Sequence, residues 1–155
     1  MLATLAVRQG VVYRSRGEIE RRAVGLLDKL RGRGESVHLE GTRTLNLAGP
    51  QHYEQNLRKL VKRNPERDAR VHFPATLVLE KRNKHDRNAV AVEWDGRTVG
   101  YLSKADAAAY RPSLDRLAAT GVTITVDGIV YAGHHGGNYW SVGVRMPQAK
   151  KMPSA

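Results

Sequence analysis

The spacing of hydrophobic positions changes along the chain and indicates which segments are strands. Short runs of alternating or β-branched apolar residues, bounded by glycine, proline or asparagine, are typical of β-strands. Six segments have this character: 44–48, 75–80, 89–94, 97–102, 122–130 and 139–146. Asp95-Gly96 separates two of them, and this dipeptide between apolar runs is the strongest short-range signal of a β-hairpin. The pattern therefore predicts several short antiparallel strands.

Two earlier segments repeat their apolar residues with the period of an α-helix. Residues 15–34 open with Ser15 and Glu18 at the spacing of a capping box, and their wide apolar stripe must dock on another surface. Residues 53–63 form a second amphipathic pattern, which ends at Asn64-Pro65.

A third helix is expected after the hairpin. Ser103 and Asp106 have the spacing of a capped N-terminus, and Gly121 is expected to end the helix. Pro112 is expected to break or restart it, because proline removes a backbone donor and crowds the preceding turn. Short strands with such helices between them do not suit a parallel βαβ sheet; they indicate an α+β fold that is mainly β, a small antiparallel barrel with two to three helices.

Charge narrows the choice of partner. The 155 residues include 26 Lys and Arg against 15 Asp and Glu, a net charge of +11, and the densest surplus lies in residues 41–70. Such a surface attracts polyanions, nucleic acid first, and an oligonucleotide-binding barrel combines a basic groove with stacking aromatics. The absence of cysteine excludes a disulfide scaffold, a cysteine nucleophile and Cys-ligated zinc. No signal peptide or transmembrane run is found in the sequence, so we expect an intracellular protein that does not act at a membrane.

Two motifs point to a known family. The segment 83–92 reads Asn-Lys-His-Asp-Arg-Asn-Ala-Val-Ala-Val, and 95–102 reads Asp-Gly-Arg-Thr-Val-Gly-Tyr-Leu. Together with the segment 47–53 before an amphipathic helix and the alanine-rich helix at 105–110, they resemble the HIRAN domain over roughly residues 44–146. This match divides the chain into an N-terminal extension (1–40), a HIRAN-like domain (41–147) and a disordered basic tail (148–155).

The resemblance implies a modified oligonucleotide-binding barrel that holds the 3′ end of single-stranded DNA. In family members linked to helicase-like remodelling ATPases, the domain recognises a free 3′-hydroxyl and supports replication-fork repair. No phosphate-binding Gly-x-x-x-x-Gly-Lys-Ser/Thr loop occurs in this chain, so a helicase, nuclease or ATPase would be a separate polypeptide. We expect a binding module, not an enzyme, with no cofactor.

The resemblance also implies roles for particular residues. Tyr53 occupies the position of an aromatic that stacks on the terminal base, with His52 beside it; its helical spacing would equally place Tyr53 in the core. Gln51 departs from the arginine that family members carry there, and it supplies a hydrogen bond but no charge. Arg58 or Lys59 could compensate.

Asp86 offers a chemical basis for reading a free end. An ionised carboxylate accepts a hydrogen bond from a hydroxyl and repels a phosphate. The alternative is that Asp86 and Asn88 are turn formers that bond to their own backbone. Tyr101 either lines the groove or packs inside. The remaining phosphate-binding candidates are basic, and they are Arg58, Lys59, Lys62, Arg63, Lys81, Arg82, Lys84 and Arg87.

Two other functions remain open. A metal-dependent nuclease or phosphohydrolase could use His85, Asp86, His134 and His135, although no spacing among them matches a known ligand pattern. An adaptor could dock a larger DNA-processing enzyme through the apolar stripe of residues 15–34. Trp94 and Trp140 are expected to pack in the core or a hairpin.

Overall fold

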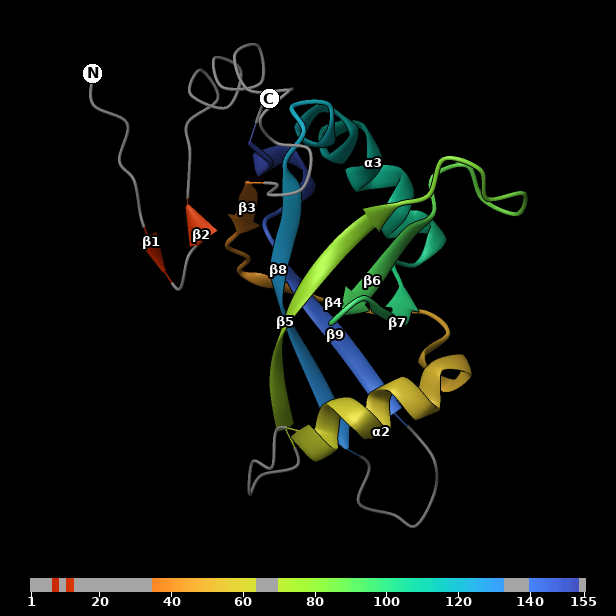
Figure 1. Cartoon of the computed structure of the whole chain (residues 1–155). Coiled ribbons are helices and arrows are strands. Elements are labelled where there is room, and N and C mark those ends of the chain that lie inside the picture. The colour runs from red at the N-terminus through yellow and green to blue at the C-terminus, as the bar shows by residue number, and fades with distance from the viewer. Residues whose placement is uncertain (1–6, 9–10, 13–34, 64–69, 133–139, 154–155) are drawn as a thin grey trace.

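The chain forms a strongly curled antiparallel sheet with a helix at each end (Figure 1). The structure is a computed structural model and describes residues 7–8, 11–12, 35–63, 70–132 and 140–153. A short antiparallel pair, β1 (Val7–Arg8) and β2 (Val11–Val12), comes first. The elements that follow are β3 (Ser36–Leu39), β4 (Arg43–Asn46), the 3₁₀ helix η1 (Pro50–Tyr53), α2 (Glu54–Arg63), β5 (Arg70–Leu79), β6 (Val90–Trp94), β7 (Arg97–Tyr101), α3 (Lys104–Ala118), β8 (Thr123–Ala132), β9 (Trp140–Met146) and the 3₁₀ helix η2 (Ala149–Lys151).

The main sheet closes on itself. Its order is β4-β9-β8-β5-β6-β7, antiparallel at every step, and β3 pairs in parallel with the first half of β8. Ala48, just after β4, bridges to Tyr101 at the end of β7, with N–H···O distances of 2.7 and 3.0 Å. This bridge joins the two ends of the strand path and makes a small barrel. The predicted fold class, mainly β and barrel-like with two helices in the described part of the chain, is confirmed.

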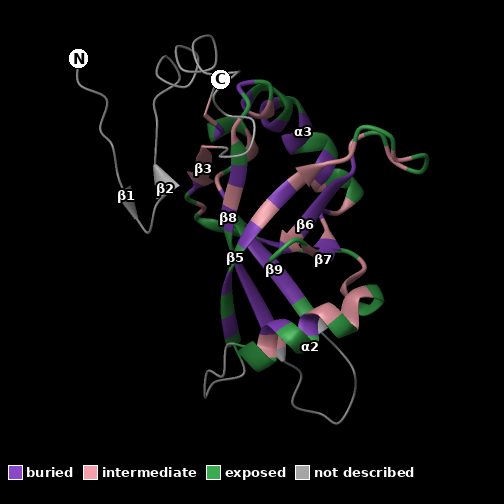
Figure 2. Cartoon of the chain, in the orientation of Figure 1, coloured by how far each residue is buried: buried purple, intermediate pink, exposed green. Residues whose placement is uncertain are grey.

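The barrel interior is the hydrophobic core. Buried residues alternate with exposed or half-buried ones along β5 from Arg70 to Val78 and along β8 from Thr123 to Gly128 (Figure 2), as expected for strands with one face inward. Leu57 and Leu60 of α2 are fully buried, and the exposed side of that helix holds its charged residues, as its amphipathic pattern predicts. The helix covers one end of the barrel, and α3 lies near the other end (Figure 1).

The hairpin between β6 and β7 has the predicted two-residue turn. Asp95 has φ of 48° and Gly96 has φ of 72°, both in the left-handed region that a type I′ turn requires. Asp95 is the one non-glycine residue with positive φ among the described residues, and its carboxylate accepts hydrogen bonds from Arg63 and Arg97 at 2.9 and 3.1 Å.

We expect Gly96→Val to destabilise the fold by about 1–2 kcal/mol, because a β-branched residue is strained at positive φ. A Cβ at this position would meet no atom within 4 Å, so backbone strain is the whole effect. Urea unfolding of Gly96→Val and Gly96→Asn measures it, and the asparagine variant should lose much less, since asparagine tolerates this conformation. Equal stability of the valine variant and the wild type would contradict the turn assignment.

The third helix begins as predicted but is not interrupted by its proline. The backbone N–H of Asp106 donates to the Ser103 hydroxyl at 3.1 Å, which caps the helix. The prediction for Pro112 is wrong, since α3 runs through it from Lys104 to Ala118. Pro112 and Ala108, four residues before it, are both exposed, so water can solvate the carbonyl that loses its donor. The opposite face of the helix is buried and holds it in place.

Strand β5 is longer than predicted, because it also includes a proline at a position that tolerates one. The sequence predicts a strand over 75–80, but β5 begins at Arg70 and includes Pro74. Only Thr76–Leu79 pair with β6, so at Pro74 the strand has β8 as its single neighbour. Proline is tolerated where one side of a strand is unpaired, and the exposed side chain of Pro74 lies outside the core.

Both predicted boundaries of the domain also change. Val37 and Leu39 of β3 are buried in the core, so the domain extends in front of residue 41. The tail is not disordered over 148–153: η2 forms at Ala149–Lys151, Met152 is buried, and the Tyr110 hydroxyl donates to the carbonyl of Pro147 at 2.6 Å. Burial of the apolar Met152 side chain holds residues 148–153 against the domain, although their basic composition is typical of a solvated tail. The helix predicted at 15–34 and the helix end at Asn64-Pro65 lie outside the described residues.

Candidate nucleic-acid interface

The segment after β4 presents an aromatic ring beside the barrel seam. Gly49 takes φ of 70°, Pro50 starts η1, and the turn leaves Gln51 and His52 exposed. Tyr53 is half-buried, and its ring lies 6.2 Å from that of Tyr101, with 41° between the planes. The structure therefore brings these two predicted residues together, and Tyr53 is neither a core residue nor fully exposed.

Tyr101 is fixed by a carboxylate that the sequence analysis did not single out. Its hydroxyl donates to Oε1 of Glu80 at 2.7 Å, while Oε2 of Glu80 accepts from Nδ2 of Asn83 at 2.7 Å. The hydrogen bond to Glu80 raises the pKa of Tyr101 well above its usual value, because deprotonation would place two anions together; burial and the adjacent Tyr53 raise the pKa further. Tyr101 therefore stays a neutral donor near pH 7.

Asn83 connects this pair to the loop between β5 and β6. Its Oδ1 accepts from the backbone N–H groups of His85 and Asp86 at 2.9 and 3.1 Å, and Oδ1 of Asp86 accepts from that of Asn88 at 2.9 Å. Asp86 is thus a turn former, which is one of the two roles considered for it in the sequence analysis. Its Oδ2 makes no hydrogen bond within the described part of the chain, so the carboxylate keeps an oxygen that can accept one from a ligand.

A buried arginine holds the two ends of this loop together. Nη1 of Arg111 donates to the carbonyls of Glu80 and Ala89 at 3.2 and 2.9 Å, and Nε donates to Asp115 at 2.9 Å. The backbone N–H of Glu80 also donates to the carbonyl of Ala89 at 3.0 Å. The sequence analysis missed Arg111. Its position between Ala107 and Leu114 on the buried face of α3 is the signal that could have found it.

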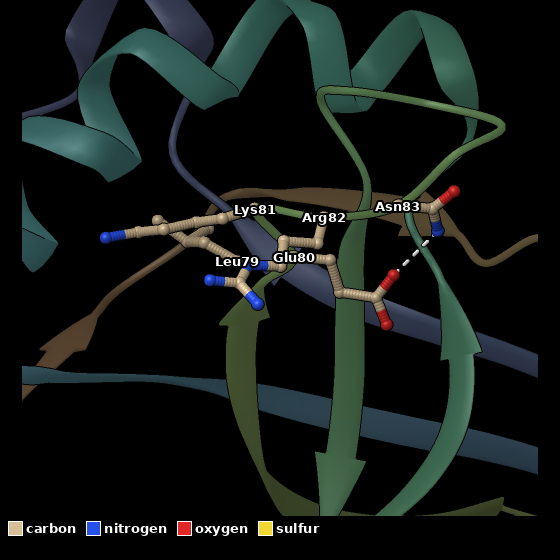
Figure 3. A pocket seen from close by; sticks show the side chains of 5 residues that line it. All are labelled: Leu79, Glu80, Lys81, Arg82 and Asn83. Atoms are coloured by element: carbon tan, nitrogen blue, oxygen red, sulfur yellow. Dashed lines mark hydrogen bonds between the residues drawn. The ribbon is translucent and has the colours of Figure 1, made fainter.

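The start of the loop lines a hollow of about 410 Å³, formed by residues 79–83. Figure 3 shows the carboxylate of Glu80 pointing toward Asn83, whereas the ammonium of Lys81 extends in the opposite direction. The loop's cations are exposed, and none of them forms an ion pair with another residue that the structure describes. These cations are Lys81, Arg82, Lys84 and Arg87. Exposed cations that form no ion pair with a described residue are available to phosphate groups.

Comparison with known protein families assigns the chain to a family. The model of the HIRAN domain matches residues 33–139, which is most of the chain. The chain belongs to the HIRAN domain family. No match was found among the curated proteins or among the solved structures. The matched range begins before β3 and confirms the resemblance in the central motifs, so this protein is a DNA-binding module with a barrel of the oligonucleotide-binding type.

Two of the four cations of α2 in this HIRAN domain, Arg58 and Arg63, are less available than those of the loop. Arg58 pairs with Glu54 at 2.6 Å within the helix. Arg63 pairs with Asp95 and lies over the ring of Trp94, 5.3 Å from its centroid. Trp94 is buried, as predicted. Lys59 and Lys62 are exposed and form no ion pair with a described residue.

The described part of the HIRAN domain contains no group of three or more His, Asp or Glu side chains that could hold a metal ion. His85 and Asp86 lie in the loop, whereas His134, His135 and Trp140's side chain fall outside what is described. Among the described residues, no helix has the length and apolar character needed to cross a membrane.

Proposed function

We propose that this HIRAN domain binds single-stranded DNA and holds a free 3′-hydroxyl end. In this proposal the ring of Tyr53 stacks on the terminal base, and Asp86 accepts a hydrogen bond from the 3′-hydroxyl. Base–aromatic stacking contributes roughly 1–3 kcal/mol per base and is tolerant of sequence. The half-buried Tyr53, packed against Tyr101, has a ring that is held in place and still partly open to solvent.

The observation that carries the proposal is the hydrogen-bonded series Tyr101–Glu80–Asn83–Asp86. It links the aromatic pair to the one loop carboxylate that keeps an unused oxygen. A terminal hydroxyl is a donor, and an ionised carboxylate is an acceptor only. A 3′-phosphate would bring an anion to the same oxygen. Free-end recognition therefore follows from one charged group in a fixed position.

Gln51 replaces a cation that family members use, so phosphate binding must rely on other residues. Arg58 already pairs with Glu54. Among the other exposed cations, we assign the phosphate contacts to Lys59 on α2 and to Lys81, Arg82 and Lys84 of the loop. We place the DNA strand along these side chains. Gln51 and His52, which are exposed and adjacent to Tyr53, are also part of the proposed site.

We further propose that the protein acts by binding, without catalysis, and supplies DNA ends to a separate repair or replication-fork enzyme. The alternative, a metal-dependent nuclease, is tested by incubating end-labelled DNA with Mg²⁺, Mn²⁺ or Zn²⁺. Cleavage that is lost in both His85→Ala and Asp86→Ala would establish the nuclease and overturn the binding-only proposal.

The direct test of the proposed function is a comparison of DNA forms. Linear single strands should bind more tightly than circular single strands of the same composition, and blunt duplexes should compete weakly because their last base is paired. Fluorescence anisotropy with unlabelled competitors measures all three. Equal affinity for linear and circular strands would overturn end recognition and leave general binding to a basic groove.

Affinity should also depend strongly on salt. If the strand contacts about five phosphates, log affinity should fall with log salt at a slope of about −3.5, at roughly −0.7 per phosphate for single strands. Lys81→Gln should make the slope less negative by about 0.7, whereas Lys150→Gln on η2 serves as the matched control and should leave it unchanged. A flat affinity between low and physiological salt would contradict the electrostatic argument.

A further inference from the structure

A second hollow lies between the 81–88 loop and the C-terminal half of α3. Its volume is about 420 Å³, and its lining consists of Lys81, Arg87, Arg111, Asp115, Ala118 and Ala119. Tyr53, Tyr101 and Asp86 are not part of this lining. The hollow is therefore distinct from the aromatic pair, although Lys81 borders both this hollow and the one beside Glu80.

The lining is positively charged. It contains three cations and one carboxylate, and Lys81 and Arg87 form no ion pair with any described residue. Arg111 is only 6% exposed, so its charge is largely removed from water. A buried cation attracts an anion more strongly than an exposed one, because solvent screens it less.

Arg111 also retains hydrogen-bonding capacity. A guanidinium has five N–H donors; Nε donates to Asp115, and the two N–H groups of Nη1 are used by the carbonyls of Glu80 and Ala89. Nη2 makes no hydrogen bond within the part of the chain that the structure describes. Donors left without a partner on a buried side chain are uncommon, and a phosphate oxygen is a suitable acceptor.

The carbonyl groups at the C-terminus of α3 already accept hydrogen bonds from other groups, so the cations of the hollow are not required to satisfy them. The carbonyl of Ala118 accepts from Gly121 N–H at 2.9 Å, and the carbonyl of Leu117 accepts from the N–H and hydroxyl of Thr120 at 3.1 and 2.6 Å. The helix C-terminus carries roughly half a negative charge. That is less than the net positive charge of the lining, so the hollow still favours an anion.

We propose that this hollow binds a phosphate group. Two sources share this chemistry: a backbone phosphate of the bound DNA strand, and a free phosphate or nucleotide. The first source rests on the proposed function, while phosphate binding by the hollow does not.

The test is a titration of the full chain with inorganic phosphate at constant ionic strength, followed by amide NMR shifts. We expect saturable shifts at Lys81, Arg87, Ala118 and Ala119. Lys81→Gln with Arg87→Gln removes two exposed charges, and the dissociation constant should rise at least about tenfold. Lys150→Gln with Lys151→Gln removes two exposed charges from η2, which does not line the hollow, and should leave the dissociation constant unchanged. Absence of saturation, or equal binding by both double variants, would overturn the proposal.

A second arm identifies the source. Saturating single-stranded DNA should displace inorganic phosphate if a backbone phosphate occupies the hollow. Phosphate binding that persists on the DNA-saturated protein would assign the hollow to a free anion and overturn the backbone source. A protein that binds phosphate but no DNA would overturn the proposed function and keep the phosphate site, so the two failures are distinguishable.

Discussion

Replacing the 3′-hydroxyl of a single strand by a phosphate should weaken its binding to this HIRAN domain about tenfold or more. The change removes the donor to Asp86 and brings an anion against its carboxylate, and a charge-assisted hydrogen bond alone contributes about 1.5–3 kcal/mol. A phosphate at the 5′ end should matter little. Competition among 3′-hydroxyl, 3′-phosphate and 5′-phosphate strands measures the difference.

Two variants assign this effect to residues. Asp86→Asn should abolish the discrimination, since an amide is uncharged and donates to phosphate; its oxygen can still accept from Asn88, which protects the turn. Tyr53→Ala should weaken both strands alike, because stacking does not sense the end group. Tyr131→Ala, which removes a half-exposed tyrosine from β8, is the matched control. Discrimination that survives Asp86→Asn would show that another group reads the end.

The second large effect is expected at Arg111. We expect Arg111→Met to lower the free energy of unfolding by about 2–4 kcal/mol, because it removes charged donors from one buried and one partly buried carbonyl, those of Ala89 and Glu80. Ala89 keeps the N–H of Glu80, whereas the carbonyl of Glu80 loses its donor from Arg111. Asp115 is half exposed, so its lost ion pair adds little.

Urea unfolding measures this loss, with Arg116→Met as the control. Arg116 is exposed on the same helix, and its replacement should change stability by less than about 0.5 kcal/mol. In folded Arg111→Met protein, DNA affinity should fall as well, since the loop that carries Asp86 loses its anchor. Equal unfolding midpoints for the two variants would contradict the anchoring role.

Local signals in the sequence predicted the local structure well. Asp95-Gly96 forms the expected turn and Ser103 caps α3, because both choices depend on backbone conformation within a few residues. The HIRAN motifs likewise identified the family. These features require no knowledge of which segments meet in space.

Tertiary contacts explain the errors. Pro112 is tolerated in α3 because the carbonyl that loses its donor lies on the exposed face of the helix. Pro74 is tolerated in β5 because no strand pairs with that side of β5 at this position. The sequence alone shows neither fact. The ordered tail depends on burial of Met152, and no local pattern indicates that.

The site was only partly predictable for the same reason. Tyr53 and Asp86 came from the resemblance to a family, whereas Glu80 emerged only when its two partners were located. One partner, Tyr101, lies 21 residues further along the chain. Pairings over such separations depend on the closed barrel, so periodicity and spacing could not reveal them.

The backbone bridge between Ala48 and Tyr101, the seam of the barrel, couples ligand binding to local opening of the sheet. Two backbone hydrogen bonds make this bridge, whereas β5 and β8 pair along eight residues, so the sheet opens most easily at the seam. Tyr101 closes the seam with its backbone and packs against Tyr53 with its ring. A ligand that immobilises this ring should slow amide hydrogen exchange at both seam residues, so occupancy of the site is readable from the protection of Ala48, a residue that need not touch the ligand.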